Sequence, residues 1–112
     1  GEYMAKDDYF VIVYQILKYL YDSLKLGRKV DFIRIDYEHL EINEEYWKYI
    51  MINMLNSSFI SGVRIIEINH GPIIKNVGIE ITPKGIEYLF ENNLIQKVKK
   101  TLKDIKDIAP FI

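Results

Sequence analysis

The chain has no cysteine, and this absence excludes several classes of site. Without thiols there is no disulfide framework, no thiolate nucleophile and no zinc site built on cysteine. A chain without disulfides also needs no oxidising compartment in order to fold. We therefore expect an intracellular, cytoplasmic protein.

Long hydrophobic runs are missing as well. Spanning a bilayer takes about 20 consecutive apolar residues. The apolar stretch at residues 9–14 is soon followed by Gln15 and Lys18, and no cleavage-site pattern accompanies it. The sequence therefore predicts neither a membrane-spanning segment nor a signal peptide, and no membrane partner.

The length of the chain favours a single domain. With 112 residues, of which 49% are hydrophobic, it is long enough for one core and too short for two ordinary domains. Gly1 to Tyr3, ahead of Met4, has the character of a tag remnant. We expect an N-terminal tail over residues 1–7 and one domain over residues 8–112.

Histidine is scarce, and the motifs of common enzyme classes are missing. The two histidines, His39 and His70, fall on separate expected elements, with Glu38 beside the first. A metal site usually needs three or four placed ligands. The serines match no catalytic motif, and the glycine patterns of P-loops and dinucleotide-binding turns are absent. The sequence thus predicts no enzyme, no metal site and no cofactor.

Net charge is small, at −1, but it is unevenly distributed. Residues 1–56 carry seven Lys or Arg against ten Asp or Glu, whereas residues 57–112 carry eight against six. Placement matters more than the total for a surface that binds a polyanion. The densest cluster of cations comprises Lys97, Lys99, Lys100, Lys103 and Lys106. A solvated helix face is the simpler interpretation of this cluster.

Residues 8–26 are predicted to form a helix that Asp7 or Asp8 caps and a glycine ends. Its polar residues follow one narrow stripe, so most of its circumference is apolar. Such a helix must be nearly surrounded by other elements. Core packing is the first interpretation. A homodimer contact along Tyr14 or Tyr21, or along the apolar stripe of the last helix, is also expected.

Residues 30–36 alternate apolar and charged side chains and are predicted as a short strand. Asp36 then caps a brief helix over residues 37–41, and Asn43 caps a third helix that ends near Asn56. The inward stripe of the third helix comprises Trp47, Ile50, Met51, Met54 and Leu55. Its outward residues comprise Glu45, Lys48, Tyr49, Ile52, Asn53 and Asn56. This phase predicts a buried tryptophan.

Two β-branched stretches, residues 59–68 and 77–81, are predicted to pair as a hairpin, and the turn signal "NHGP" lies between them. Thr82 then caps a helix whose first residue is Pro83, a position where the missing N–H costs nothing. The hairpin is therefore expected to run straight into the next helix.

Asn92 and Asn93 are expected to end that helix in the left-handed conformation. A last helix over residues 94–109 carries an apolar stripe, and Pro110 ends it. Its stripe comprises Val98, Leu102, Ile105 and Ala109.

The order helix, strand, helix, helix, two-stranded hairpin, helix predicts an α+β winged helix with an added C-terminal helix. Three segments carry a resemblance: "INEEYWKYIMINMLNSSFISGV", "ITPKGIEYLFEN" and "KTLKDIKDI". Across residues 8–108 the chain resembles the YjcQ-like family of small bacterial and prophage winged-helix proteins. The resemblance implies this fold, a phage or prophage origin and no catalytic residue, and the fold class makes DNA an expected partner.

Double-stranded DNA is the first partner that this fold suggests, because Lys and Arg neutralise phosphates and Asn pairs with adenine. The candidate residues on the third helix are Lys48, Tyr49, Asn53 and Asn56. The other candidates are Arg34, Arg64, Lys75, Lys84, Lys97 and Lys100. Against this interpretation, Glu44 and Glu45 stand at the N-terminus of the third helix, where they repel phosphate.

A protein-interaction module on the same scaffold, without DNA binding, is the alternative. Tyr49 and Ile52 would form an apolar strip on the outward face, between Glu45 and Lys48. Aromatic residues are enriched at interface hot spots. A helix phase shifted by one position would move Ile52 toward the core and remove this interpretation.

Overall fold

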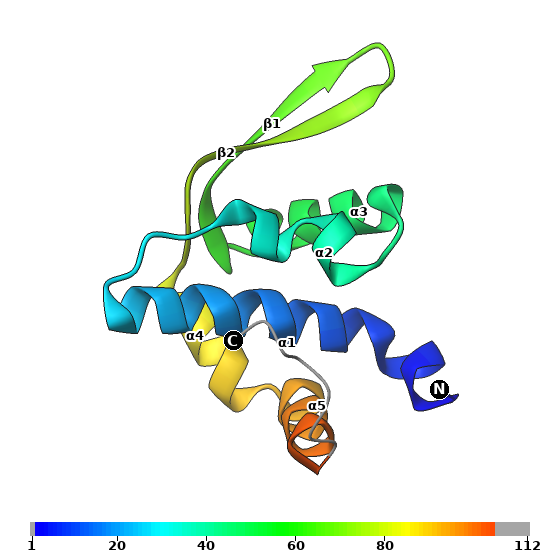
Figure 1. Ribbon diagram of the computed structural model, residues 1–112, viewed down its shortest axis with the longest axis vertical. Helices are drawn as coiled ribbons and strands as arrows, with labels where there is room; N and C mark the ends of the chain where they lie inside the picture. Colours follow the sequence, from blue (N-terminus) through cyan, green and yellow to red (C-terminus); the bar gives the residue numbers. More distant parts are fainter. Residues whose placement is uncertain (1, 105–112) are drawn as a thin grey trace.

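The computed structural model describes residues 2–104 of the chain, and side chains over residues 8–102. The elements are α1 (Glu2–Leu26), η1 (Phe32–Ile35, a 3-10 helix), α2 (Tyr37–Leu40), α3 (Glu44–Asn56), β1 (Ile60–Ile68), β2 (Gly71–Ile81), α4 (Pro83–Glu91) and α5 (Asn93–Asp104). In Figure 1, α1 crosses the middle of the molecule, with α2, α3 and the hairpin on one side and α4 and α5 on the other. The predicted α+β class is confirmed, and the arrangement is compatible with a winged-helix-like fold.

Helix α1 is the centre of the core. It packs against α4, α5, β2 and η1. Its buried residues are Val11, Ile12, Val13, Tyr14, Ile16, Leu17, Leu20 and Ser23. Tyr21, the other residue expected at a dimer contact, packs its ring edgewise against Phe90 of α4. The apolar circumference of α1 is thus largely covered within one chain, and the homodimer stays a prediction.

The start of α1 differs from the prediction. The helix begins at Glu2, so Asp7 and Asp8 lie inside it and do not cap it. Met4, Ala5 and Lys6 are good helix formers, and no glycine or proline interrupts the segment between Glu2 and Asp8. Helix propensity therefore carries the helix past the expected cap.

The strand predicted at residues 30–36 is wrong, because Phe32–Ile35 forms the 3-10 helix η1. The Asp31 carboxylate accepts a hydrogen bond from the Ile33 N–H at 3.2 Å and so caps this turn. The carbonyl of Ile35 accepts a hydrogen bond from the indole N–H of Trp47 at 2.8 Å. A side chain thus satisfies backbone that a neighbouring strand would otherwise have to pair.

The predicted caps of α2 and α3 are confirmed. The Asp36 carboxylate accepts from the Tyr37 N–H at 2.8 Å, and the Asn43 side chain accepts from the N–H groups of Glu45 and Tyr46. Between the two helices Glu41 adopts the left-handed conformation, with φ 57°. The buried residues of α3 are Trp47, Ile50, Met51 and Met54, and Leu55 is half-buried. The predicted phase of α3 is therefore correct.

Strands β1 and β2 form a two-stranded antiparallel sheet that projects away from the helices (Figure 1). The second strand begins at Gly71, well before the predicted Val77, because β-branched residues on both strands continue the pairing up to the turn. The pairing is irregular between Ser61 and Val63. Gly62 has φ +76° there, and a Cβ on it would collide with the carbonyl of Gly78. Only glycine fits this crossing of the strands.

The segment after β2 ties α4 to the end of α3. Thr82 caps α4 by accepting from the Gly85 N–H at 2.9 Å, while its hydroxyl donates to the carbonyl of Ser58. Its own N–H donates to the carbonyl of Phe59 at 3.0 Å. A Cβ on Gly85 would collide with that same carbonyl and would lie 2.8 Å from Ile81 Cγ1. The predicted cap and the proline at the first helical position are confirmed.

The junction of α4 and α5 is not the left-handed end predicted for Asn92 and Asn93. Asn92 is extended, with φ −71° and ψ 128°, and Asn93 is the first residue of α5. The Asn92 side chain accepts hydrogen bonds from the N–H groups of Leu94 and Ile95, so it caps α5. The side chain of Asn92 thus begins α5 at the point where a left-handed end of α4 was expected.

The apolar stripe of α5 is confirmed where the structure describes it. Val98 and Leu102 are buried against the core. The expected continuation through Ile105 and Ala109 to Pro110 lies outside the described residues.

Trp47 provides a direct test of this core, because it is 4% exposed and hydrogen-bonded through its indole. We expect Trp47→Ala to lower the free energy of unfolding by about 3–5 kcal/mol. Trp47→Phe should cost about 1–3 kcal/mol, since it leaves the buried Ile35 carbonyl without its partner. Urea unfolding measures both. Tyr49→Ala, on the exposed side of the same helix, is the control, and an equal loss there would contradict the assigned phase.

Candidate nucleic-acid interface

The N-terminal half of α3 offers no available cation. Lys48 Nζ lies 3.8 Å from a Glu44 carboxylate oxygen and 3.6 Å from one of Glu45. The Lys48 side chain is only 14% exposed. Its charge is therefore balanced by two acids one turn earlier, and it is a poor contact for phosphate.

The remaining α3 candidates are unevenly suited to reading bases. The Asn53 side-chain amide donates to the carbonyl of Tyr49 at 2.7 Å, so its N–H groups partly serve its own helix. Tyr49 is 59% exposed, and its ring meets that of Tyr9 edgewise with the ring centroids 6.4 Å apart. Asn56 is exposed at the end of the helix. Ile52, predicted outward, is half-buried, because it lies beside the buried stripe.

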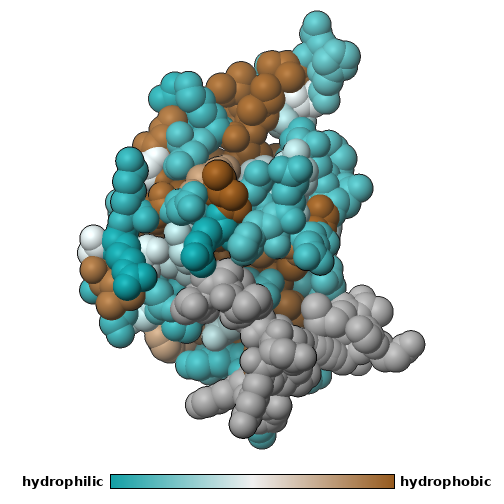
Figure 2. Space-filling model, in the orientation of Figure 1, coloured by the Kyte–Doolittle hydropathy of each residue, from teal (hydrophilic) through white to brown (hydrophobic). Residues whose placement is uncertain are grey.

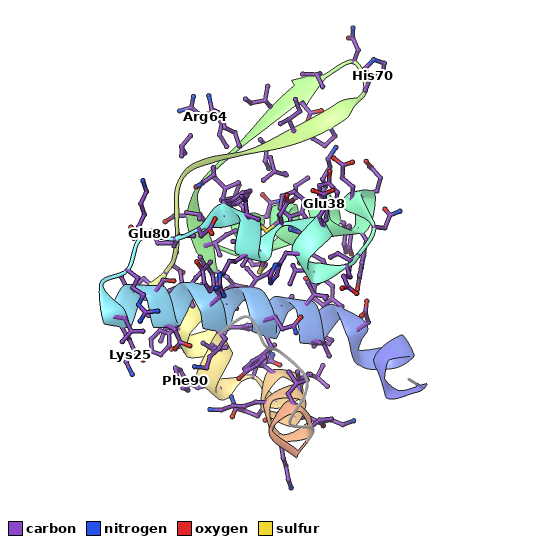
Figure 3. The ribbon with its side chains drawn as sticks, viewed as in Figure 1. Lys25, Glu38, Arg64, His70, Glu80 and Phe90 are labelled. Atoms are coloured by element: carbon purple, nitrogen blue, oxygen red, sulfur yellow. The ribbon has the colours of Figure 1, made fainter. Side chains whose placement is uncertain are left out.

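The surface around α2 and the start of α3 is acidic. Glu38, Glu41, Glu44 and Glu45 are all exposed there, and Figure 3 shows Glu38 on α2. The pKa of Tyr37 is raised above its ordinary value, first by the charge of Glu44 and then by burial and by further acids. A phosphate approaching α3 by this end would meet the same repulsion.

The hairpin carries a different arrangement. Arg64 of β1 lies directly opposite Lys75 of β2 in the strand register, and both residues are exposed. Neither forms an ion pair within the part of the chain that the structure describes. Arg64 extends on the side of the hairpin away from α2 and α3 (Figure 3). The two cations are therefore close to each other and unbalanced.

The other predicted cations are scattered. Arg34 lies on η1 and Lys84 in the first turn of α4. Lys97 and Lys100 lie on α5, which is on the other side of α1 from the hairpin (Figure 1). The structure thus brings Arg64 and Lys75 together and leaves the α5 lysines apart from them.

Sequence reasoning missed the apolar side chains beside these two cations. The exposed aliphatic residues of the hairpin are Ile66 (36%), Ile68 (46%), Ile73 (43%) and Val77 (50%). With the second strand predicted to begin at Val77, Lys75 and Ile73 fell in a loop and had no register. The β-branched residues after "NHGP" were the signal that could have extended the strand.

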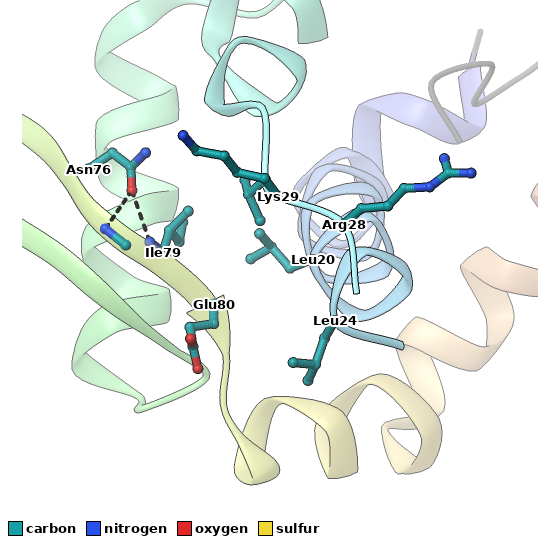
Figure 4. Close-up of a pocket in the computed structure, with 9 residues that line it drawn as sticks. Leu20, Leu24, Arg28, Lys29, Asn76, Ile79 and Glu80 are labelled. Carbon is teal, nitrogen blue, oxygen red and sulfur yellow. Dashed lines mark hydrogen bonds between the residues drawn. The ribbon is translucent and has the colours of Figure 1, made fainter. Parts of the chain in front are cut away.

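A hollow of about 360 Å³ lies at the base of the hairpin, beside the end of α1. It is lined by Leu20, Leu24, Arg28, Lys29, Val30, Asn76, Gly78, Ile79 and Glu80. Figure 4 shows Lys29 extending toward β2 while Arg28 points away. The Asn76 side chain accepts hydrogen bonds from the N–H groups of Gly78 and Ile79, at 3.0 and 2.9 Å. The side-chain oxygen of Asn76 therefore stabilises the backbone of β2 where the pairing with β1 is irregular.

The two histidines lie on different elements, His39 on α2 and His70 at the tip of the hairpin (Figure 3). Among residues 8–102, no three His, Cys, Asp or Glu side chains are placed to hold a metal ion. None of the helices over residues 2–104 is long and apolar enough to cross a membrane.

The comparison with protein families matches this fold to one of them. The family model described as YjcQ protein covers residues 14–108, which include the hairpin and the Thr82 to Gly85 junction. The chain belongs to the YjcQ family. Neither the curated proteins nor the solved structures contain a match to it. Within the described residues of this YjcQ protein, Arg64 and Lys75 lie opposite each other and form no ion pair with an acid.

A half-buried tyrosine, Tyr46, links α1 to α3 in this YjcQ protein and makes stability depend on pH in the alkaline range. Partial burial, then the negative charge of Asp8 and a hydrogen bond to its carboxylate, raise the pKa of Tyr46 to about 12. An unfolded tyrosine titrates near pH 10, so this contribution is complete below about pH 10 and is lost as the pH rises toward 12.

We expect the stability advantage of the wild type over Tyr46→Phe to shrink between about pH 10 and about pH 12. Urea midpoints of both proteins across this range measure it. An advantage that stays constant over the range would contradict the raised pKa.

Proposed function

We propose that this YjcQ protein is a regulatory module that binds double-stranded DNA chiefly through the β1–β2 hairpin. The observation that carries the proposal is the cross-strand pair of Arg64 and Lys75, which is exposed and forms no ion pair with an acid among residues 8–102. A phage or prophage origin is part of the proposal and rests on the family resemblance. The proposal needs no catalytic activity or cofactor, and it assigns the protein to the cytoplasm.

The cross-strand pair costs stability unless an anion accompanies it. Like charges directly opposite each other on neighbouring strands are destabilising. A phosphate between the two side chains would remove that repulsion and would be neutralised in turn. This supports a polyanion partner.

The charges on α3 favour a complex in which DNA contacts mainly the hairpin. Lys48 is held by Glu44 and Glu45, whose remaining negative charge faces solvent at the helix N-terminus. In many helix-turn-helix proteins this end of the helix approaches base edges. Here that approach is opposed by Coulomb repulsion. DNA would accordingly lie closer to the hairpin than to α3.

A protein-docking module remains the second candidate because of Tyr49. A tyrosine that is 59% exposed on the outward face of α3 is the kind of residue that anchors interfaces. The half-burial of Ile52 leaves it with less apolar surface than the sequence suggested. Binding to such a partner should depend little on salt, in contrast to binding to phosphate.

A mobility-shift assay on AT-rich duplex across a salt series tests the proposal. Arg64→Ala combined with Lys75→Ala should lower the slope of log K against log salt by about two units, since each lost phosphate contact removes about 0.9. Lys25→Ala with Arg28→Ala removes the same charge near the end of α1 and is the matched control. No shift of the duplex by wild type at low salt would overturn the proposal, and so would an equal slope change in the control.

Removing the acids of α3 tests the electrostatic explanation separately. Glu44→Gln combined with Glu45→Gln should tighten non-specific duplex binding, because it removes repulsion and releases Lys48. The same assay measures the change. Unchanged affinity in this variant would mean that DNA does not approach the acidic surface closely enough to be repelled by it.

A further inference from the structure

One face of the hairpin combines apolar and cationic side chains. Residues that are opposite in register, or two apart on a strand, point to the same side of a sheet. Arg64, Ile66 and Ile68 of β1 therefore share a face with Ile73 and Lys75 of β2, which we call the outer face. All five are exposed. Figure 2 shows hydrophobic surface gathered over the hairpin.

The opposite face of the hairpin is the one used for folding. Val63 and Ile74 are half-buried and pack against the core. Glu67, the one acid of β1, also belongs to this opposite face, across from Pro72. The isoleucines of the outer face are thus not part of the core, and neither Arg64 nor Lys75 forms an ion pair within the described part of the chain.

A second copy of the chain fits the outer face poorly. Packing two outer faces together would add a second unbalanced pair of cations to the first. A stable dimer also buries about 800 Å² on each partner, from about 20–30 residues. The outer face offers five side chains.

Duplex DNA fits both properties of the outer face. Its phosphates would neutralise Arg64 and Lys75, and its minor groove accepts apolar side chains that wedge between base pairs. The three isoleucines offer no hydrogen-bond donor or acceptor, so in the major groove they could contact only the methyl groups of thymine. The charge and the apolar surface therefore favour the minor groove.

We propose that Ile68 and Ile73, the two most exposed isoleucines of the outer face, insert into the minor groove and bend the duplex. This proposal rests on the proposed DNA binding and specifies how the hairpin would contact the duplex. Ile73 lies two residues from Lys75, a separation of about 7 Å along the strand. Each DNA strand carries one phosphate per about 3.4 Å of helix axis, so a β-strand aligned with that axis would place Lys75 about two base pairs from the wedge.

Energy transfer between dyes at the two ends of a duplex tests the bend. The probe is an AT-rich duplex of about 30 base pairs with a central TA step, which is easily kinked. Ile68→Thr with Ile73→Thr removes the wedge and keeps β-branched residues in the strands. Leu26→Gln with Leu94→Gln removes apolar side chains that are also exposed, at 64% and 42%, but lie elsewhere, and it is the control. Circular dichroism verifies that each variant is folded.

Wild type and control should raise the transfer efficiency, as a bend of about 20–90° requires. The wedge variant should bind with an unchanged salt slope and without that rise. Binding by wild type without a rise would overturn the wedge and leave the proposed DNA binding intact. An equal rise in the wedge variant would also overturn it. Failure of wild type to bind at all would overturn both proposals, and sedimentation of wild type against the wedge variant would then reveal self-association through this face.

Discussion

The need to cover a helix that is apolar around most of its circumference determines the arrangement of the rest of the chain. Ile16 and Leu17, at the middle of α1, have no exposed surface at all. Helices α4 and α5, strand β2 and the η1 turn each contribute to this cover. Because so much of the molecule surrounds one helix, few elements are left to project from it. The hairpin is the main one, and its outer face is therefore available for a partner.

In winged-helix folds the third helix and the hairpin often form one binding surface. In this protein α3 and the hairpin differ in charge. On α3, Lys48 forms ion pairs with acids of its own helix, whereas on the hairpin Arg64 and Lys75 form none with the side chains that the structure describes. The net charge of −1 conceals this difference. A polyanion would meet repulsion at one surface and attraction at the other. The proposed binding through the hairpin follows from that contrast.

Local signals in the sequence predicted much of the fold, and long-range contacts account for the errors. The caps at Asp36, Asn43 and Thr82 and the phase of α3 follow from residues close together in the chain. The alternation at residues 30–36 predicts a strand, whereas the structure has a 3-10 helix whose Ile35 carbonyl is bonded by the distant indole of Trp47.

The candidate site was predictable only in part. The ion pairs of Lys48 could be predicted, because Glu45 and Glu44 precede it by three and four residues on the same helix. The pairing of Arg64 with Lys75 could not, because it depends on the strand register. The central claim is that DNA contacts the hairpin, and amide chemical shifts during titration with AT-rich duplex test it most directly. We predict the largest changes around Arg64 and Lys75. Changes concentrated on α3 around Asn53 would contradict the account.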